Sequence, residues 1–272
     1  MNSKPLDHYF KTAIDELATI DGRVFYLSIL MKNATKEIIN NNLYSTGTLI
    51  GKGLGFRDVT LEKGLGNHFV PRNHYAISKD TAKSETEMIL SRECLFQVAQ
   101  SYELLESFLY NAVAEFISYK QPIEVLERLN TDNTSFESVR AKLKRMKDRT
   151  NNHHLLSILR DNIKQFKENE THNLYDFDFT TWYFLISEAR HCITHRRTKI
   201  TKQLSSLLEH PCNIYFNIIA SEQVIFIQDH VCHELLKRIA EFIYLVYKTV
   251  SEVCYNDKVN LTSIYTLFET NQ

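Results

Sequence analysis

The chain has 272 residues, of which 43% are hydrophobic and 24% charged, a composition that can fill the core of a globular protein. Its 7 glycines and 4 prolines are few for this length, which favours long helices over an all-β sandwich with its many turns. The formal net charge of −1 excludes a chain-wide attraction to nucleic acid or to an anionic membrane surface. Any RNA-binding surface must therefore be local.

The cysteines and the lengths of the apolar runs indicate in which cellular compartment the protein is expected. The 5 cysteines are an odd number and none lies in a CxxC pair, which is typical of reduced thiols in the cytoplasm. The N-terminal segment lacks the apolar stretch of a signal peptide. No apolar run approaches the ~18 residues that a membrane-spanning helix needs. We therefore expect a soluble, cytoplasmic protein without a membrane partner.

Residues 1–79 are predicted to form an N-terminal extension. Two helices are expected between positions 5 and 41, with a break near Gly22. The other glycines all lie between Gly47 and Gly66, where the spacing Gly47-x3-Gly51-Lys52 is one residue too short for a phosphate-binding P-loop. An irregular loop or a small hairpin is therefore the better prediction for this stretch.

Residues 80–255 are predicted to form the main helical domain, and residues 256–272 a C-terminal tail. Apolar residues recur at three- and four-residue steps from Ser78 to Tyr119, which predicts one long helix, or two joined by a kink, ended by Pro122. The further predicted elements are helices at 136–149 and 155–167, a helix from Thr180 or Thr181 to about 195, a β-hairpin near 213–228 and a helix at 229–255. The predicted fold class is all-α, a helical bundle with a small hairpin.

The sequence Arg190-His191-Cys192-Ile193-Thr194-His195 places an arginine and a histidine with four residues between them. In a chain with 13 arginines and 11 histidines, about half a match to Arg-x4-His is expected by chance. A second match, Arg149 and His154, indeed lies in a polar, asparagine-rich turn. The match at Arg190 instead ends an aromatic, apolar helix and precedes a basic turn, so its context favours a functional role.

This helix resembles the third core helix of HEPN-superfamily domains, which carries an Arg-x4-6-His motif, often with Asn, Asp or His after the arginine. The segment Ala99–Phe116 is similar to the first core helix of that family, where an acidic residue precedes an aromatic–leucine pair; Glu106, Phe108 and Leu109 match. The resemblance covers about residues 85–255 and implies a HEPN-like helical bundle.

The resemblance implies a metal-independent endoribonuclease without a cofactor, acting as a homodimer in which two arginines and two histidines converge on one phosphate. Arg190 and His195 would be catalytic, His191 would assist and Glu106 would support the site. A guanidinium group can bind two phosphate oxygens at once, and a histidine side chain exchanges protons near neutral pH. The RNA 2′-OH would attack its own phosphate and leave a 2′,3′-cyclic phosphate, a reaction that DNA cannot undergo.

Two further expectations concern partners. Arg196, Arg197 and Lys199 directly follow the motif and are candidates for contacts with RNA phosphates. A denser basic stretch at 140–149 has its charges all round the helix, which is typical of a solvated helix. By the family resemblance the biological role would be that of a toxin or a phage-defence effector, with an antitoxin or a regulatory protein as a possible partner.

Two functions of other classes stay open. The first is a catalytically inactive binding module for a nucleotide or a protein partner, because arginine and histidine at a helix end also stabilise the helix dipole. The second is a metal-dependent helical-bundle enzyme that uses Glu188, His191 and His195, which share one helical face. Di-iron bundles need two Glu-x-x-His motifs and only one occurs here, so no metal is expected.

Overall fold

The computed structural model describes residues 4–40, 48–50, 56–57, 68–69, 76–147 and 153–269. These residues form the helices α1 (Pro5–Asn40), α2 (Ala82–Lys120), α3 (Ile123–Leu129), α4 (Phe136–Lys147), α5 (His153–Asn162), α6 (Lys164–Asn169), α7 (Phe179–His195), α8 (Lys202–Leu208), α9 (Asp229–Tyr255) and α10 (Leu261–Glu269). The strands are β1 (Thr48–Ile50), β2 (Phe56–Arg57), β3 (His68–Phe69), β4 (Ala76–Ser78), β5 (Asn217–Ile219) and β6 (Val224–Phe226). The predicted all-α fold with a small hairpin, β5–β6, is confirmed. None of the described helices combines the length and the apolar character needed to cross a membrane.

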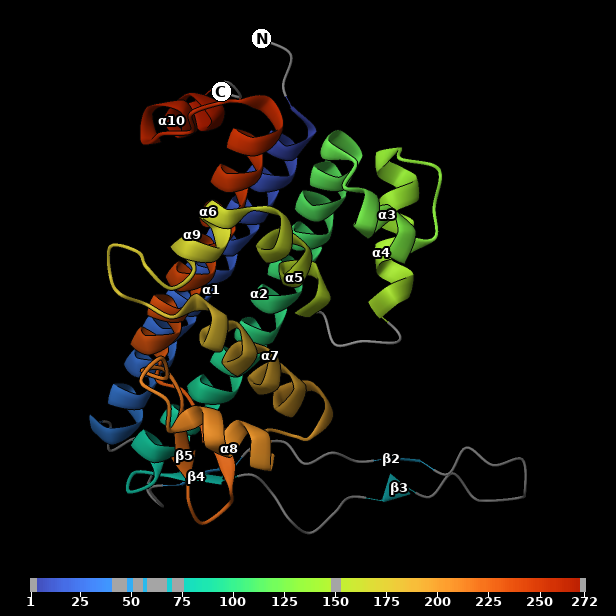
Figure 1. Cartoon of the computed structure of the whole chain (residues 1–272). Helices are drawn as coiled ribbons and strands as arrows, with labels where there is room; N and C mark the ends of the chain where they lie inside the picture. The colour runs from blue at the N-terminus through green and yellow to red at the C-terminus, as the bar shows by residue number, and fades with distance from the viewer. Residues whose placement is uncertain are drawn as a thin grey trace.

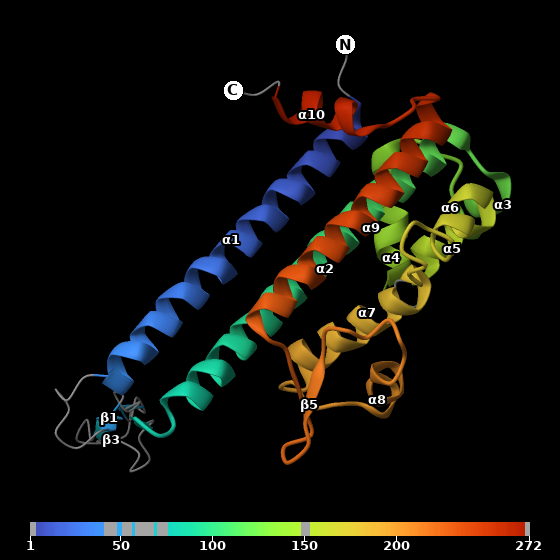
Figure 2. The ribbon, with the colours of Figure 1, turned by 90° about the vertical axis from the view of Figure 1, so that its left-hand side faces the viewer.

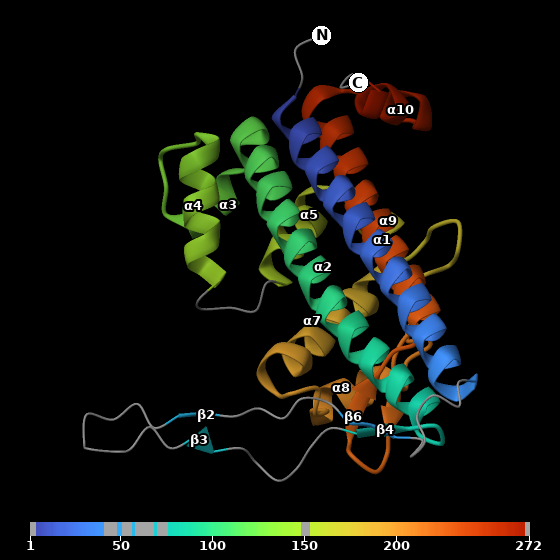
Figure 3. The same ribbon diagram turned by 180° about the vertical axis from the view of Figure 1, so that it is seen from behind.

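Three long helices, α1, α2 and α9, lie side by side at the centre of the fold (Figure 1). Figure 2 shows α1 on one side of α2 and α9, with α7, α8 and the β5–β6 hairpin on the other. The short helices α3 and α4 pack near the C-terminal end of α2 (Figure 3). The final long helix, α9, begins and ends at the predicted residues, because its apolar stripe faces the core along its whole length.

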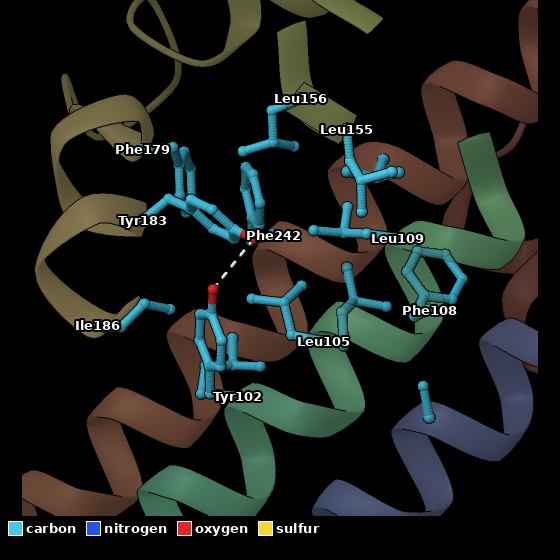
Figure 4. Packing of buried hydrophobic residues seen from close by; sticks show 14 of the residues in the cluster. Tyr102, Leu105, Phe108, Leu109, Leu155, Leu156, Phe179, Tyr183, Ile186 and Phe242 are labelled. Atoms are coloured by element: carbon cyan, nitrogen blue, oxygen red, sulfur yellow. Dashed lines mark hydrogen bonds between the residues drawn. The ribbon is translucent and has the colours of Figure 1, made fainter. Parts of the chain in front are cut away.

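A core of aromatic and aliphatic side chains fixes α7 against α2 and α9. Figure 4 shows Tyr183 of α7 pointing toward Tyr102 of α2, and the Tyr102 hydroxyl donates a hydrogen bond to the Tyr183 hydroxyl over 3.2 Å. Burial raises the pKa of both phenols, so both stay neutral. Phe242 of α9 stacks on Phe179 at the start of α7, with ring centroids 5.2 Å apart. The helix that carries the motif therefore has a fixed position in the fold.

The predicted break near Gly22 is wrong, because α1 is one continuous helix of 36 residues. Gly22 lies on the exposed face, where an added side chain would meet no atom within 4 Å. A glycine costs a helix about 1 kcal/mol relative to alanine. Burial of Leu17, Ile20 and Val24 on the opposite face outweighs that cost. These side chains belong to the same hydrophobic cluster as those of α2 and α9, so the core extends across the boundary predicted at residue 79.

Three other boundaries differ from the prediction. The helix expected at 155–167 is two helices, α5 and α6, because the buried Ile163 between them has extended backbone angles of φ −129° and ψ 96°. Helix α7 begins at Phe179, since the Asp178 side chain accepts a hydrogen bond from the Thr181 amide over 3.1 Å and caps the helix. The predicted tail contains α10, which packs against α1.

The glycine-rich stretch is described only in part. Its glycines from Gly47 to Gly66 lie outside the described residues, as does the predicted Gly47-x3-Gly51-Lys52 spacing. The strands β1 and β4 pair in antiparallel fashion, and so do β2 and β3. These pairings agree with the hairpin alternative of the prediction.

Polar contacts at Asp229 join α1 to α9. Ser28 and Lys32 of α1 both donate hydrogen bonds to the Asp229 carboxylate. Partial burial raises the pKa of Asp229, but the hydrogen bonds from Lys32 and Ser28 outweigh that effect, so the net pKa is lowered. A carboxyl group whose pKa is lowered by folding stabilises the protein above its unfolded pKa. That contribution is lost as the pH falls through the folded pKa.

We expect Asp229→Asn to be less stable than the wild type at pH 7, because the ion pair with Lys32 is lost. The difference in unfolding free energy should begin to shrink as the pH falls below about 4, the ordinary pKa of an aspartate. It should vanish once the pH is below the lowered folded pKa, where the wild-type carboxyl group is protonated as well. Urea unfolding of both proteins at pH 7, 5 and 3 measures this difference. An equal difference at all three pH values would contradict the assigned role of the Asp229 charge.

Candidate functional site

Two exposed histidines form a pair at the C-terminal end of α7. The rings of His191 and His195 have centroids 5.3 Å apart and planes tilted by 48°. Residues four apart in a helix lie one above the other on the same face, which accounts for this contact. The structure therefore brings together two of the three predicted catalytic residues, and both are exposed.

Arg190 points in another direction. Its Nη2 donates to Oε1 of Glu103 on α2 over 3.1 Å, and the arginine side chain is only 26% exposed. Five residues along a helix correspond to a rotation of about 140°, so Arg190 and His195 cannot share one face of α7. Within a single chain, Arg190 lies beside α2 while the histidine pair faces solvent.

The glutamate that meets Arg190 is not the one singled out from the sequence. Glu106 is only 6% exposed, and its charge adds to the effect of burial in raising the pKa of Tyr102 and of Tyr183. Glu103, one turn earlier on α2, forms the ion pair with Arg190. Residues three apart lie on the same side of a helix, so the spacing alone could not tell which glutamate faces the arginine.

The basic turn after α7 has a strained backbone. Arg197 and Thr198 have φ angles of 52° and 66°, and a left-handed conformation is unfavourable for a β-branched residue. The Cys192 carbonyl accepts hydrogen bonds from the amides of Arg196 and Thr198 over 3.1 and 2.9 Å. The Ile225 amide of β6 donates to the Thr198 carbonyl over 3.1 Å. The hairpin thus holds the turn in place, a contact that the sequence did not indicate.

Thr198→Gly is expected to relieve this strain. The unfolding free energy should rise by about 1 kcal/mol, since glycine adopts positive φ without a steric penalty. The turn should also become looser, which lowers the affinity of Arg197 and Lys199 for a phosphate. Thermal unfolding and oligonucleotide binding measure the two effects. A lower melting temperature would contradict the assignment of strain at this position.

A pocket of about 800 Å³ lies between α2, the end of α7 and the β5–β6 hairpin. His195 lines it together with Arg197 and Lys199, which were predicted to bind phosphate. The other lining residues are Met88, Ser91, Arg92, Leu95, Phe96, Ile193, Thr194, Thr198, Ile219, Glu222, Val224, Ile225 and Phe226. Of the described residues in this lining, four are basic, counting His195, and one is acidic.

Sequence reasoning missed two residues of this pocket, Arg92 and Phe96. Both are exposed on α2, and Phe96 retains 61% of its surface. They stand four residues apart and lie outside the apolar stripe that includes Leu95, Val98 and Ala99. An aromatic and a basic residue on the polar side of a long helix are the signal that could have revealed them.

The remaining predicted residues lie outside the pocket. Arg196 is exposed but does not line it, and its charge acts on Cys192, whose pKa is raised mainly by burial. Glu188 accepts a hydrogen bond from the Thr201 hydroxyl over 3.5 Å. Among the residues that the structure describes, no three His, Cys, Asp or Glu side chains are grouped so as to hold a metal ion. Of the second Arg-x4-His match, Arg149 lies outside the described residues and His154 is 8% exposed.

The comparisons with known proteins add no family to this description. No protein-family model, no curated protein and no solved structure matches the chain. The similarity to HEPN domains therefore stays an expectation, which rests on the motif at 190–195 and on the similarity of residues 99–116.

Proposed function

We propose that this protein is a metal-independent endoribonuclease of the HEPN type. The observation that carries the proposal is the exposed pair of His191 and His195 beside a pocket that Arg197 and Lys199 also line. One histidine would accept the proton of the RNA 2′-OH as the 2′-oxygen attacks phosphorus. The other would donate a proton to the 5′-oxygen as the P–O5′ bond breaks. The products are a 2′,3′-cyclic phosphate and a 5′-hydroxyl end.

The proposed homodimer gives Arg190 a role in this reaction. Because Arg190 and His195 lie on different sides of α7, one chain does not offer both to a single phosphate. If the α7 helices of two copies meet, the arginine of one copy can approach the histidines of the other. There its guanidinium group would stabilise the charge that develops on the phosphate oxygens. Size-exclusion chromatography with light scattering measures the oligomeric state directly.

The decisive experiment is incubation of the purified protein with total RNA in EDTA. We expect cleavage by the wild type, products that carry a 2′,3′-cyclic phosphate, and no cleavage of an all-deoxy strand of the same sequence. His195→Ala should cleave RNA far more slowly than the wild type. His8→Ala, which removes an exposed histidine near the start of α1, is the matched control and should remain active. Activity that requires added metal ions would favour the metal-dependent alternative, and intact RNA throughout would exclude the proposed reaction.

A binding module without catalysis is the second candidate, and the ion pair between Arg190 and Glu103 favours it, because it occupies the guanidinium group. Glu103→Gln removes the charge and keeps the size of the side chain. If Arg190 must leave Glu103 to act, this variant should cleave RNA several-fold faster than the wild type. Initial rates on a fluorogenic RNA substrate measure the effect. An unchanged rate would mean that Arg190 only stabilises the contact between α2 and α7.

The same resemblance supports a role as a toxin or a phage-defence effector in the cytoplasm, held inactive by an antitoxin or a regulatory protein. Induced expression in a bacterial host tests this role. The wild type should arrest growth, whereas His195→Ala expressed at the same level should not. Equal growth of both cultures would contradict the toxin role. The nuclease activity is tested separately, by the assay with purified protein.

A further inference from the structure

We infer that the pocket between α2, α7 and the β5–β6 hairpin binds one nucleotide of an RNA strand, with its base stacked on Phe96 and its phosphate held by Arg92 and Lys199. This inference rests on the proposed function, which makes the bound strand RNA. It deepens that function by placing the nucleotide next to the scissile phosphate in this pocket and by naming Arg92 and Phe96 as binding residues.

The charge around the pocket favours an anionic ligand. Arg92, Arg197 and Lys199 line it, and in the described part of the chain none of the three makes a side-chain hydrogen bond or ion pair. Among the described residues that line the pocket, Glu222, in the turn between the two strands, is the single acidic one. Three cations that meet no carboxylate partner among the described residues, beside the single carboxylate of Glu222, create a positive local potential in a chain whose net charge is −1.

The apolar part of the lining favours a planar base. Phe96 is 61% exposed although its neighbour Leu95 is 1% exposed and belongs to the core. An exposed phenylalanine ring offers a face on which a base of any sequence can stack. Ile219, Val224 and Phe226 of the hairpin also line the pocket and add apolar surface. A volume of about 800 Å³ lies within the range of roughly 300–1,000 Å³ that is typical of small-ligand sites.

The pocket also has the right position for a nucleotide next to the cleavage site. His195 lines it, and His191 contacts His195. A phosphate held by Arg92 and Lys199 would therefore lie near the proposed general acid and base. Glu222 can accept a hydrogen bond from an exocyclic amino group of a base or from a ribose hydroxyl, whereas a bare inorganic phosphate would use neither Glu222 nor Phe96.

Binding can be measured without cleavage on the wild-type protein, because a 2′-O-methyl RNA pentamer lacks the nucleophile. We expect Phe96→Leu to weaken binding of a fluorescein-labelled pentamer about tenfold, since stacking on an aromatic ring is lost. Arg92→Gln should weaken binding as well and reduce the slope of log Kd against log salt by about 0.7, the value for one phosphate contact on a single strand. Fluorescence anisotropy from 50 to 300 mM salt measures both quantities.

The matched controls are Phe25→Leu and Arg23→Gln, which remove a ring of similar exposure and an exposed guanidinium group from α1. Helix α1 lies on the other side of α2 and α9 from the hairpin (Figure 2). Both should bind the pentamer as tightly as the wild type. Phe96 is largely exposed, so its replacement should leave the melting temperature unchanged. Equal affinities of Phe96→Leu and Phe25→Leu, or no binding of the pentamer by the wild type, would overturn the inference.

Two further measurements separate this inference from the proposed function. Titration with 5′-AMP tests whether the ligand is an RNA strand or a free nucleotide. Weaker binding of 5′-AMP than of the pentamer supports a strand. Equal affinities, with the same loss of affinity in Phe96→Leu and Arg92→Gln, support a free nucleotide. The cleavage assay in EDTA is run in parallel. If the pentamer binds in a way that depends on Phe96 but no RNA is cleaved, the proposed nuclease activity is refuted and the nucleotide-binding role of the pocket stands. If Phe96→Leu and Arg92→Gln cleave RNA at the wild-type rate, the nucleotide-binding role of the pocket is refuted and the proposed nuclease activity stands.

Discussion

Replacement of His195 by alanine is expected to lower the rate of RNA cleavage by about 10²- to 10⁴-fold, the range in which a general acid or base contributes to catalysis. His191→Ala should have an effect of the same order, because the two rings lie on the same face with centroids 5.3 Å apart. Both side chains are exposed, so neither replacement removes core packing. Initial rates with a fluorogenic RNA substrate in EDTA measure the loss.

Chemical rescue separates catalysis from a structural effect in this prediction. Imidazole added to His195→Ala should restore part of the activity, since it can exchange protons at the position of the missing ring. His8→Ala should keep the wild-type rate and gain nothing from imidazole. A His195→Ala protein that melts at the wild-type temperature and cleaves RNA at the wild-type rate would refute the assigned role.

The second large effect is expected in the core, at the ion pair between Arg160 and Glu170. Nε and Nη2 of Arg160 donate to the two carboxylate oxygens of Glu170 over 2.5 and 2.8 Å, and the Glu170 side chain is only 1% exposed. The Glu170 carbonyl also accepts a hydrogen bond from the Phe179 amide over 2.9 Å. The pair therefore joins α5 to the first residue of α7, and so to the helix that carries the histidine pair.

Arg160→Met should destabilise the protein by about 3–5 kcal/mol at pH 7, because a buried carboxylate loses its partner. Burial raises the pKa of Glu170 even with Arg160 present. A carboxyl group with a raised folded pKa contributes most stability below its unfolded pKa and less as the pH rises through the folded value. The loss in Arg160→Met should therefore be smaller at pH 5 than at pH 7, since a protonated Glu170 needs no counter-charge.

A double variant tests the physical reason for this loss. Arg160→Met combined with Glu170→Leu removes both charges and fills the site with apolar groups, so most of the stability should return. Urea unfolding of the two single variants and of the double variant gives the coupling energy of the pair. Additive losses in the double variant would mean that the two side chains stabilise the fold independently.

The sequence by itself determined the elements that depend on a repeating pattern of apolar residues. It predicted the long helix that became α2, the hairpin β5–β6 and the helix α9 with both of its ends. It also placed His191 and His195 on one face, because helical spacing fixes which residues are neighbours within an element. In each case the information lies within a few residues along the chain, where local geometry decides the outcome.

Only the tertiary structure decided what depends on contacts between distant segments. Burial against α2 and α9 made α1 continuous through Gly22, which local propensity had predicted to be a break. The choice of Glu103 over Glu106 as the partner of Arg190 depends on how α2 and α7 pack. The pocket exists because the turn after α7 is hydrogen-bonded to β6 and both face α2. A helical pattern shows on which face of its helix each side chain lies. Which other helix packs against that face depends on the packing free energy of the whole core.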